Sequence, residues 1–347
     1  MKYITGKDGL KIRGYWLMVL ACILITGCSS DDTDEQATST LHFKAYTAAF
    51  QDTNAPTRAA TEIAGFTEYA PSADYSVGLF LLSGDATTAT AQYIRRSNNS
   101  WHSQIKVTEG IPYYIYGFMP KHEQMQPSMT KDGEHIQIIL DGIDVVSAED
   151  VCVITGVHET ENNLVEGAFT YTGKADNNAI SVLMDHLYAA VRFKMTIGTD
   201  YQKLRSIKLK GMTLRASKAS TTATVVLKPN NTGASPIKEI DYSVTGTSKE
   251  AVFFESASGV ELSADDYQVA TCYFAPAVSD QLTLTVTYDV YDKNGNKIRE
   301  NNTATNQLPY LAAGRGQQVT VNLTIEPTYL LVLSDADLDN PALIIGN

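Results

Sequence analysis

Apolar and polar residues alternate with a period of two along most of the chain, which is the pattern of β-strands with one buried face. Leu41, Phe43 and Ala45 alternate with polar residues, and a longer alternation covers residues 282–290. An Asn-Gly pair follows within residues 292–296. Because Asn-Gly accepts positive φ at both central positions of a tight turn, it predicts a hairpin that returns through residues 297–303. Further strands are predicted at residues 75–82, 113–118, 136–140, 151–157, 189–197, 204–209, 222–227, 269–274 and 319–325.

Many short strands without a sustained helical period predict an all-β protein built from sandwiches. The chain exceeds the size at which a single core usually stops growing, so two domains are expected. A polar stretch at residues 172–178 marks the expected seam. We therefore predict an N-terminal sandwich at residues 41–180 and a C-terminal sandwich at residues 181–347, whose terminal tail begins at about residue 328.

The N-terminus has the pattern of a lipoprotein signal peptide over residues 1–27. Four basic residues precede eleven mostly apolar residues at 15–25, and two small residues then lead to Cys28. The thiol of Cys28 is the nucleophile that can carry a diacylglyceryl group. The alternative, a membrane-spanning helix, needs about 20 apolar residues. We therefore predict lipidation at Cys28.

The segment that follows, residues 28–40, is acidic and almost without apolar side chains, which predicts a solvated tether. The whole chain has a formal net charge of −12. Nucleic-acid binding draws on clustered lysine and arginine, so a nucleic-acid partner is not expected.

Two cysteines remain in the predicted mature chain, Cys152 and Cys272. Each lies in an apolar, strand-like run, which predicts buried free thiols. A disulfide stays open as an alternative in an oxidising envelope. Two isolated cysteines do not supply enough ligands for a metal site.

Motifs of catalysis and of cofactor or metal binding are not evident in the sequence. His122-Glu123 and His158-Glu159 lack the second histidine of a metalloprotease helix. A nucleophile elbow and a phosphate loop are missing as well. The alternating aspartates at 335, 337 and 339 lack the glycine and the glutamate that complete a calcium loop. We therefore predict a protein that is not an enzyme and has neither cofactor nor metal.

Several segments in a fixed order resemble the fimbrillin family, the subunits and accessory proteins of the type V pili of Bacteroidetes. They are Cys28 with its preceding small residues, the first strand at 41–46, the Thr-Arg-Ala-Ala-Thr run at 57–61, and residues 77–80, 113–120, 185–193 and 314–327. The acidic run after Cys28 also resembles an export signal to the outer face of the outer membrane. The resemblance spans nearly the whole predicted mature chain.

The resemblance implies two transthyretin-like β-sandwich domains in tandem, exported as a surface lipoprotein of the outer membrane. It further implies a cut between Arg58 and Ala59, which releases the first strand with the lipid and lets a strand from another pilus subunit fill the groove. Tyr329, Leu331 and Leu333 have the alternation of such a donor strand. The alternative is that they belong to a final strand of their own domain.

Two functions follow as expectations. The first is a structural and adhesive pilus subunit whose partners are other subunits, and whose contact with the outer membrane through its lipid ends at maturation. The second is a monomeric surface lipoprotein that binds a host glycan or protein. Tyr113, Tyr114 and Tyr116 could line a carbohydrate surface, although core packing also explains them.

Overall fold

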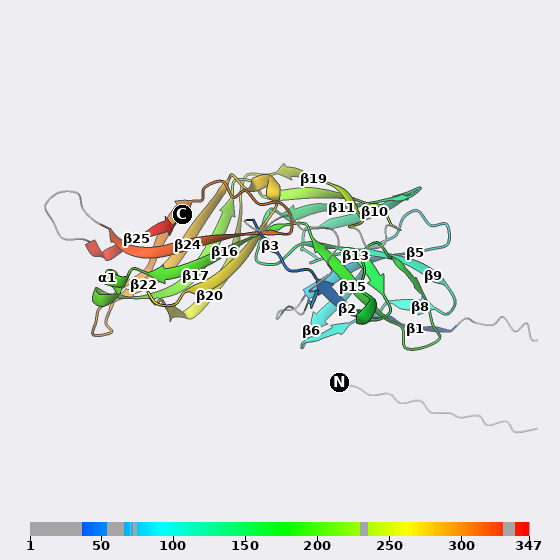
Figure 1. The fold of residues 1–347 in the computed structure, drawn as a ribbon, viewed down its shortest axis with the longest axis horizontal. Helices are drawn as coiled ribbons and strands as arrows, with labels where there is room; N and C mark the ends of the chain where they lie inside the picture. The colour runs from blue at the N-terminus through cyan, green and yellow to red at the C-terminus, as the bar shows by residue number, and fades with distance from the viewer. Residues whose placement is uncertain are drawn as a thin grey trace, which may run out of the picture. The chain divides into compact units, whose positions relative to one another are not determined.

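The computed structural model describes residues 37–53, 66–69, 71, 75–229, 235–328 and 337–346, all within the compact unit Gln36–Asn347. The regular secondary structure of this part of the chain is almost entirely β-strand, arranged in five sheets (Figure 1). The predicted all-β sandwich class is confirmed. The short helices described are α1 (Thr199–Leu204), η1 (Glu161–Asn163) and η2 (Pro276–Val278). Among the described residues, no helix has the length and apolar composition that a membrane crossing requires.

A nine-stranded sheet contains the predicted first strand. Its order is β4-β2-β15-β13-β9-β5-β6-β7, with β14 beside β9. The bounds are β2 (His42–Thr47), β4 (Thr67–Glu68), β5 (Tyr75–Ser83), β6 (Gln92–Ser97), β7 (Ser100–His102), β9 (Pro112–Met119), β13 (Cys152–His158), β14 (Thr170–Thr172) and β15 (Ala179–His186). The central strands β13 and β15 are buried on both faces, which explains their nearly continuous apolar runs.

A four-stranded sheet, β10-β11-β18-β19, buries one face in the same apolar core. Its strands are β10 (Gln126–Asp132), β11 (His135–Asp144), β18 (Ser220–Leu227) and β19 (Ile237–Thr245). Ile136, Ile138 and Leu140 of β11 are fully buried, as their alternation predicts. β11 pairs with β18. This sheet therefore joins strands from both sides of the domain boundary predicted at residues 180 and 181. The boundary itself remains a prediction.

Two further sheets contain most of the later strands. A six-stranded sheet has the order β12-β21-β16-β24-β25, with β3 beside β24, and a four-stranded sheet has the order β20-β17-β22-β23. Phe193 of β16 stacks on Phe253 of β20 at 5.3 Å between ring centroids, so the two sheets pack face to face. The bounds are β3 (Gln51–Asp52), β12 (Val146–Ser147), β16 (Ala189–Ile197), β17 (Ser206–Ala216), β20 (Lys249–Glu261), β21 (Gln268–Phe274), β22 (Leu282–Tyr291), β23 (Lys297–Gln307), β24 (Gln317–Thr328) and β25 (Asp337–Gly346).

The remaining sheet has two strands, β1 (Thr38–Thr40) and β8 (Lys106–Thr108), paired antiparallel. β1 comprises the last three residues of the segment predicted as a tether. The chain is therefore already in a paired strand just before β2 begins.

The predicted hairpin is present as β22 and β23, although its turn differs from the prediction. Gly295 has a φ of +82°, whereas Asn294 is not among the residues with positive φ. Asp292 organises the loop instead, because its Oδ1 accepts hydrogen bonds from the backbone N–H groups of Asn294 and Asn296, both at 2.8 Å. An aspartate that bonds the backbone ahead of it is a common turn former.

Candidate strand-exchange site

The residues predicted to carry maturation lie outside the part of the chain that the structure describes. These are Cys28, Arg58 and Ala59, together with the donor candidates Tyr329, Leu331 and Leu333. Their roles stay predictions. The structure does describe the strand that a cut after Arg58 would release, and the chain on either side of that strand.

β2 is an internal strand of the nine-stranded sheet (Figure 1). It runs parallel to β15, in a register that pairs His42 with Ala179 and Thr47 with Met184. On its other side it pairs antiparallel with β4 through Tyr46 and Thr47. Without β2, the edge of β15 would present unpaired backbone N–H and C=O groups.

Alternate side chains of the first strand enter the core. Leu41 and Ala45 are fully buried and Phe43 is 6% exposed. Phe43 packs edge-on against Trp101 with ring centroids 5.1 Å apart. The three buried side chains are therefore two large ones, Leu41 and Phe43, followed by a small one, Ala45. Any replacement strand would have to match this order of sizes.

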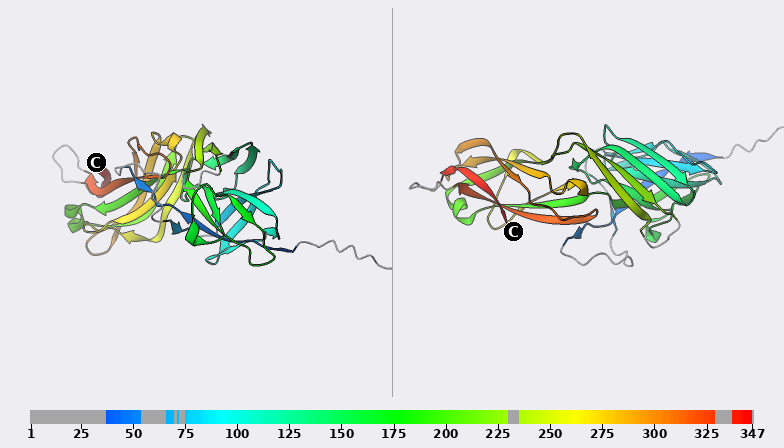
Figure 2. Two further views of the ribbon diagram at one scale, coloured as in Figure 1. Left: turned by 45° about the vertical axis from the view of Figure 1, so that its right-hand side comes forward. Right: turned by 90° about the horizontal axis from the view of Figure 1, so that it is seen from above.

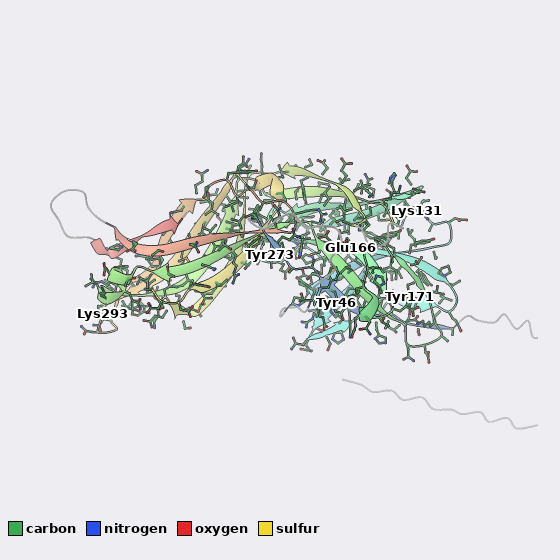
Figure 3. All side chains as sticks on the ribbon, in the orientation of Figure 1. Tyr46, Lys131, Glu166, Tyr171, Tyr273 and Lys293 are labelled. Atoms are coloured by element: carbon green, nitrogen blue, oxygen red, sulfur yellow. The ribbon has the colours of Figure 1, made fainter. Side chains whose placement is uncertain are left out.

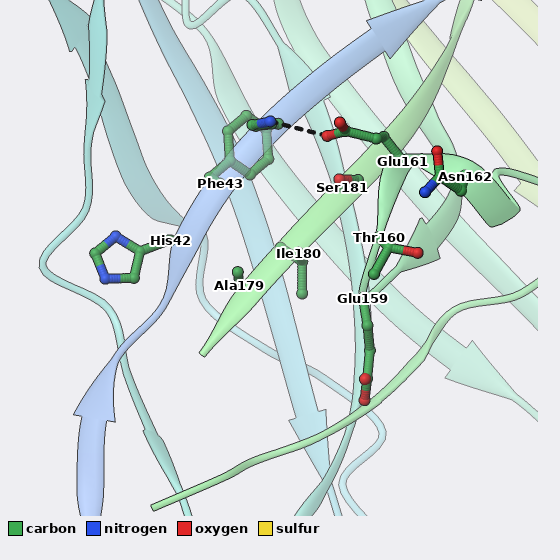
Figure 4. A pocket seen from close by; sticks show the side chains of 10 residues that line it. His42, Phe43, Glu159, Thr160, Glu161, Asn162, Ala179, Ile180 and Ser181 are labelled. Carbon is green, nitrogen blue, oxygen red and sulfur yellow. Dashed lines mark hydrogen bonds and ion pairs between the residues drawn. The ribbon is translucent and has the colours of Figure 1, made fainter. Parts of the chain in front are cut away.

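The opposite face of β2 borders a half-open pocket of about 410 Å³ between β15 and η1 (Figure 4). Lys44 Nζ lies 2.8 Å from Glu161 Oε2, an ion pair that the dashed line in Figure 4 marks. The hydroxyl of Tyr46, which is labelled in Figure 3, donates to the same oxygen at 3.1 Å. The hydrogen bond from Lys44 lowers the pKa of Glu161. Both ion-pair partners are about half exposed, so this pair adds little to stability.

The chain beyond β2 contacts the end of β15 and then joins a second sheet. The backbone carbonyl of Ala48 accepts a hydrogen bond from His186 Nε2 at 2.7 Å, and the ring of Phe50 stacks on the His186 ring at 3.8 Å. β3 then pairs parallel with β24, and the Gln51 N–H donates to the Gly316 carbonyl at 2.9 Å. Residues 37–53 therefore contact three sheets in succession.

His186 belongs to a buried cluster with Asp150 and Cys152. His186 Nδ1 is 2.6 Å from Asp150 Oδ2, and the Cys152 thiol donates to the same oxygen at 3.1 Å. Burial alone would lower the pKa of His186, but the Asp150 carboxylate outweighs it and the pKa is raised. Burial raises the pKa of the Cys152 thiol well above its usual value, and Asp150 raises it further. A buried, protonated thiol is not an activated nucleophile.

The sequence predicted one member of this cluster, Cys152, as a buried free thiol. Cys152 and Cys272 are both buried and free, as predicted. The sequence analysis did not predict a role for Asp150, whose one distinctive feature is that it is an acidic residue directly before an apolar run. The three residues meet because β13 and β15 pair Cys152 with His186 across the sheet.

The tyrosine cluster of β9 has partners inside the protein. Tyr116 is 1% exposed and packs on Phe169 with ring centroids 4.9 Å apart. The Tyr113 hydroxyl accepts a hydrogen bond from the Thr108 N–H at 3.0 Å. Core packing therefore accounts for Tyr116, whereas Tyr113 and Tyr114 are partly exposed.

Residues 337–346 form a final strand, which agrees with the alternative stated for the C-terminal segment, although Tyr329, Leu331 and Leu333 lie outside the described residues. β25 pairs antiparallel with β24, from Asn322 with Gly346 to Pro327 with Pro341, and lies at the edge of the six-stranded sheet. The red β25 lies beside β24 in each view (Figures 1 and 2). Residues 337–346 thus extend a sheet of their own chain.

Comparison with known proteins gives structural similarity only. No protein-family model and no curated protein sequence matches the chain. A fimbrial protein from Bacteroides vulgatus is similar at 14% identity and a TM-score of 0.40, over 82% of this chain and 94% of that one. A candidate cell adhesion protein from Bacteroides fragilis is similar at 11% identity and a TM-score of 0.41, over 89% and 97%. The fimbrial anchor protein Mfa2 from Porphyromonas gingivalis is similar at 10% identity and a TM-score of 0.21, over 88% and 96%. These structural neighbours are fimbrial and cell adhesion proteins.

Proposed function

We propose that this chain is a structural and adhesive subunit of a cell-surface pilus. It is exported as a lipoprotein anchored through Cys28, is cut after Arg58, and assembles with other subunits by strand exchange. The observation that carries this proposal is the position of β2, an internal strand that lies in the chain before Arg58. A cut after Arg58 separates this strand from the remainder of its sheet.

The groove left by β2 has the properties of a strand acceptor. Backbone groups of β15 lose their partners, and the pockets that hold Leu41 and Phe43 lose their apolar contents. An extended segment with alternate apolar side chains satisfies both needs together, which is the physical basis of β-strand addition. The small side chain of Ala45 sets the third position, so a donor needs two large residues followed by a small one.

The removed segment would leave more than one groove. β1, β2 and β3 all precede Arg58, so the partners of all three, β8, β15 and β24, lose a neighbour. Release of the segment also uncovers His186, which Ala48 and Phe50 contact. Maturation would therefore change the surface of three sheets in one step.

N-terminal sequencing and intact-mass measurement of the protein recovered from the cell surface test this proposal. A mature N-terminus at Ala59 is expected for the native chain, and Arg58→Ala is expected to keep the acylated precursor. Arg299→Ala, a change of an exposed arginine on β23, is the matched control and should mature normally. Acylated Cys28 on all of the native protein would contradict maturation and favour the alternative, a lipid-tethered receptor for a glycan or host protein.

A further inference from the structure

Three different metal-binding side chains converge in the core beneath the segment that follows β2. A carboxylate oxygen of Asp150, the sulfur of Cys152 and a ring nitrogen of His186 all lie within 4.8 Å of one another. The side chains of Asp150 and His186 are 5% and 4% exposed, and Cys152 is fully buried. Protein interiors rarely place such groups together without a shared proton or cation between them.

The surroundings orient the histidine as a metal ligand. Its Nε2 bonds the Ala48 carbonyl at 2.7 Å, which leaves Nδ1 directed at Asp150 and Cys152. Metal-ligating histidines almost always donate their second ring nitrogen to a carbonyl or carboxylate in this way. The Tyr75 hydroxyl donates to the Asp150 carbonyl at 3.1 Å and so fixes the backbone of the carboxylate.

The cluster also contains an unsatisfied acceptor. Asp150 Oδ1 is buried and has no hydrogen-bond partner, although Oδ2 has two. A buried carboxylate oxygen without a partner is costly. With Nε2 bonded to a carbonyl, a neutral His186 presents a lone pair at Nδ1, 2.6 Å from a second acceptor. Either a proton or a cation must lie between these two atoms.

We propose that Asp150, Cys152 and His186 form a binding site for one zinc ion, with water or the second oxygen of Asp150 as the fourth ligand. Mixed nitrogen, sulfur and oxygen ligands suit Zn²⁺, which binds thiolate, imidazole and carboxylate in tetrahedral sites. Binding releases the thiol proton of Cys152 and any proton on His186 Nδ1 to solvent. The bound cation then neutralises the two negative charges of thiolate and carboxylate.

One of the three separations between ligand atoms already matches this ion, and the other two require the carboxylate to move. Zinc–ligand bonds of about 2.0 to 2.3 Å place tetrahedral nitrogen and sulfur ligands about 3.6 Å apart and nitrogen and oxygen ligands about 3.4 Å apart. Cys152 Sγ and His186 Nδ1 are 3.6 Å apart already. Asp150 Oδ2 lies 2.6 Å from Nδ1 and 3.1 Å from Cys152 Sγ, so the carboxylate must move away from Nδ1 by about 0.8 Å and from the sulfur by about 0.5 Å to admit the ion.

The chain offers a matched control for the cysteine. Cys272 is as fully buried as Cys152, but its sulfur contacts the backbone carbonyls of Ser147 and Tyr273. Replacing either cysteine by alanine removes one buried sulfur from a strand. Only the replacement of Cys152 removes a proposed ligand, so the two variants separate metal binding from packing.

Metal binding to the purified full-length chain tests the proposal. Cys22→Ser and Cys28→Ser in every sample leave Cys152 and Cys272 as the remaining thiols. Because the site is buried, each protein is unfolded, freed of metal with a chelator and refolded with Zn²⁺ or with Co²⁺. We expect one ion per chain, a thiolate-to-cobalt charge-transfer band, and a zinc-dependent rise in melting temperature for the parent and for Cys272→Ala.

Cys152→Ala is expected to lose the charge-transfer band and at least nine-tenths of the bound metal. Asp150→Asn keeps the shape of the side chain and should weaken metal binding at least tenfold. This variant still tests the proposal if Cys152→Ala does not fold. Folding of each variant is checked by circular dichroism in chelator. Refolded parent protein without a charge-transfer band, or an equal band in Cys152→Ala, would overturn the proposal and leave protons as the occupants of the cluster.

Discussion

Truncation of Phe43 to alanine measures how strongly β2 is held in its sheet. The phenyl ring is 6% exposed and packs edge-on against Trp101. A buried phenylalanine removes about 200 Å² from water, which at about 25 cal/mol per Å² corresponds to an upper bound of about 5 kcal/mol. Measured losses for Phe→Ala in protein cores are about 3 to 5 kcal/mol. We therefore expect Phe43→Ala to lower the free energy of unfolding by about 3 kcal/mol.

Denaturant unfolding of the uncut chain, followed by tryptophan fluorescence and circular dichroism, is the assay. Lys44→Ala is the matched control, because Lys44 is the next residue on the same strand and forms an ion pair with the half-exposed Glu161. Its expected effect is below about 1 kcal/mol. A loss of unfolding free energy below about 1 kcal/mol for Phe43→Ala, or equal losses for the two variants, would mean that β2 does not present Phe43 to the core.

Three further changes test other parts of the fold. Ala45→Phe should destabilise the chain by about 1 to 3 kcal/mol, because the small side chain is fully buried; unchanged unfolding would mean that the groove is wider than described. Burial would raise the pKa of Asp289, but bonds to the backbone and to Lys297 outweigh it and lower the pKa. The stability that Asp289 contributes is therefore present above its unfolded pKa of about 3.9 and is lost as the pH falls through the lower folded value. Asp289→Asn should be less stable than the native chain at neutral pH, and the difference in free energy of unfolding should shrink as the pH falls; a difference that stays constant with pH would refute this. Gly173→Ala should lower the melting temperature by several degrees, because a Cβ there would lie 2.1 Å from the Thr108 carbonyl oxygen; an unchanged melting temperature would contradict that close approach.

Strands with one buried face were predictable from the sequence. β22 covers the alternation that begins at Leu282, and β2 covers most of the one that begins at Leu41. β15 was missed: its residues are buried on both faces and lack a period of two, and its apolar run was not recognised as that of the equally buried β13 was. β19 was missed as well: it lies at a sheet edge and its residues are half-exposed or exposed, so its hydrophobic signal is weak. β23 has an equally weak signal but was predicted from the turn that precedes it.

The site required information that residue patterns do not contain. The sequence indicated a buried Cys152, yet its contact with His186 depends on the register between β13 and β15. A shift of one residue would turn every side chain of a strand to the other face. Asp150 lies just outside β13 and joins the cluster through that same register. Local patterns fix the faces of strands, whereas the pairing of distant strands requires the folded chain.

The covalent attachment of β2 makes this strand a tethered competitor of any incoming strand. A segment joined to its own groove by a short chain acts at an effective concentration in the millimolar range. A free donor at micromolar concentration would need to bind about a thousandfold more tightly to displace it. Cleavage between β3 and β4 would abolish that advantage, since a released segment is lost by dilution. Under the proposed function, one hydrolysed peptide bond therefore turns a protomer that is stable alone into one that is complete only within a polymer.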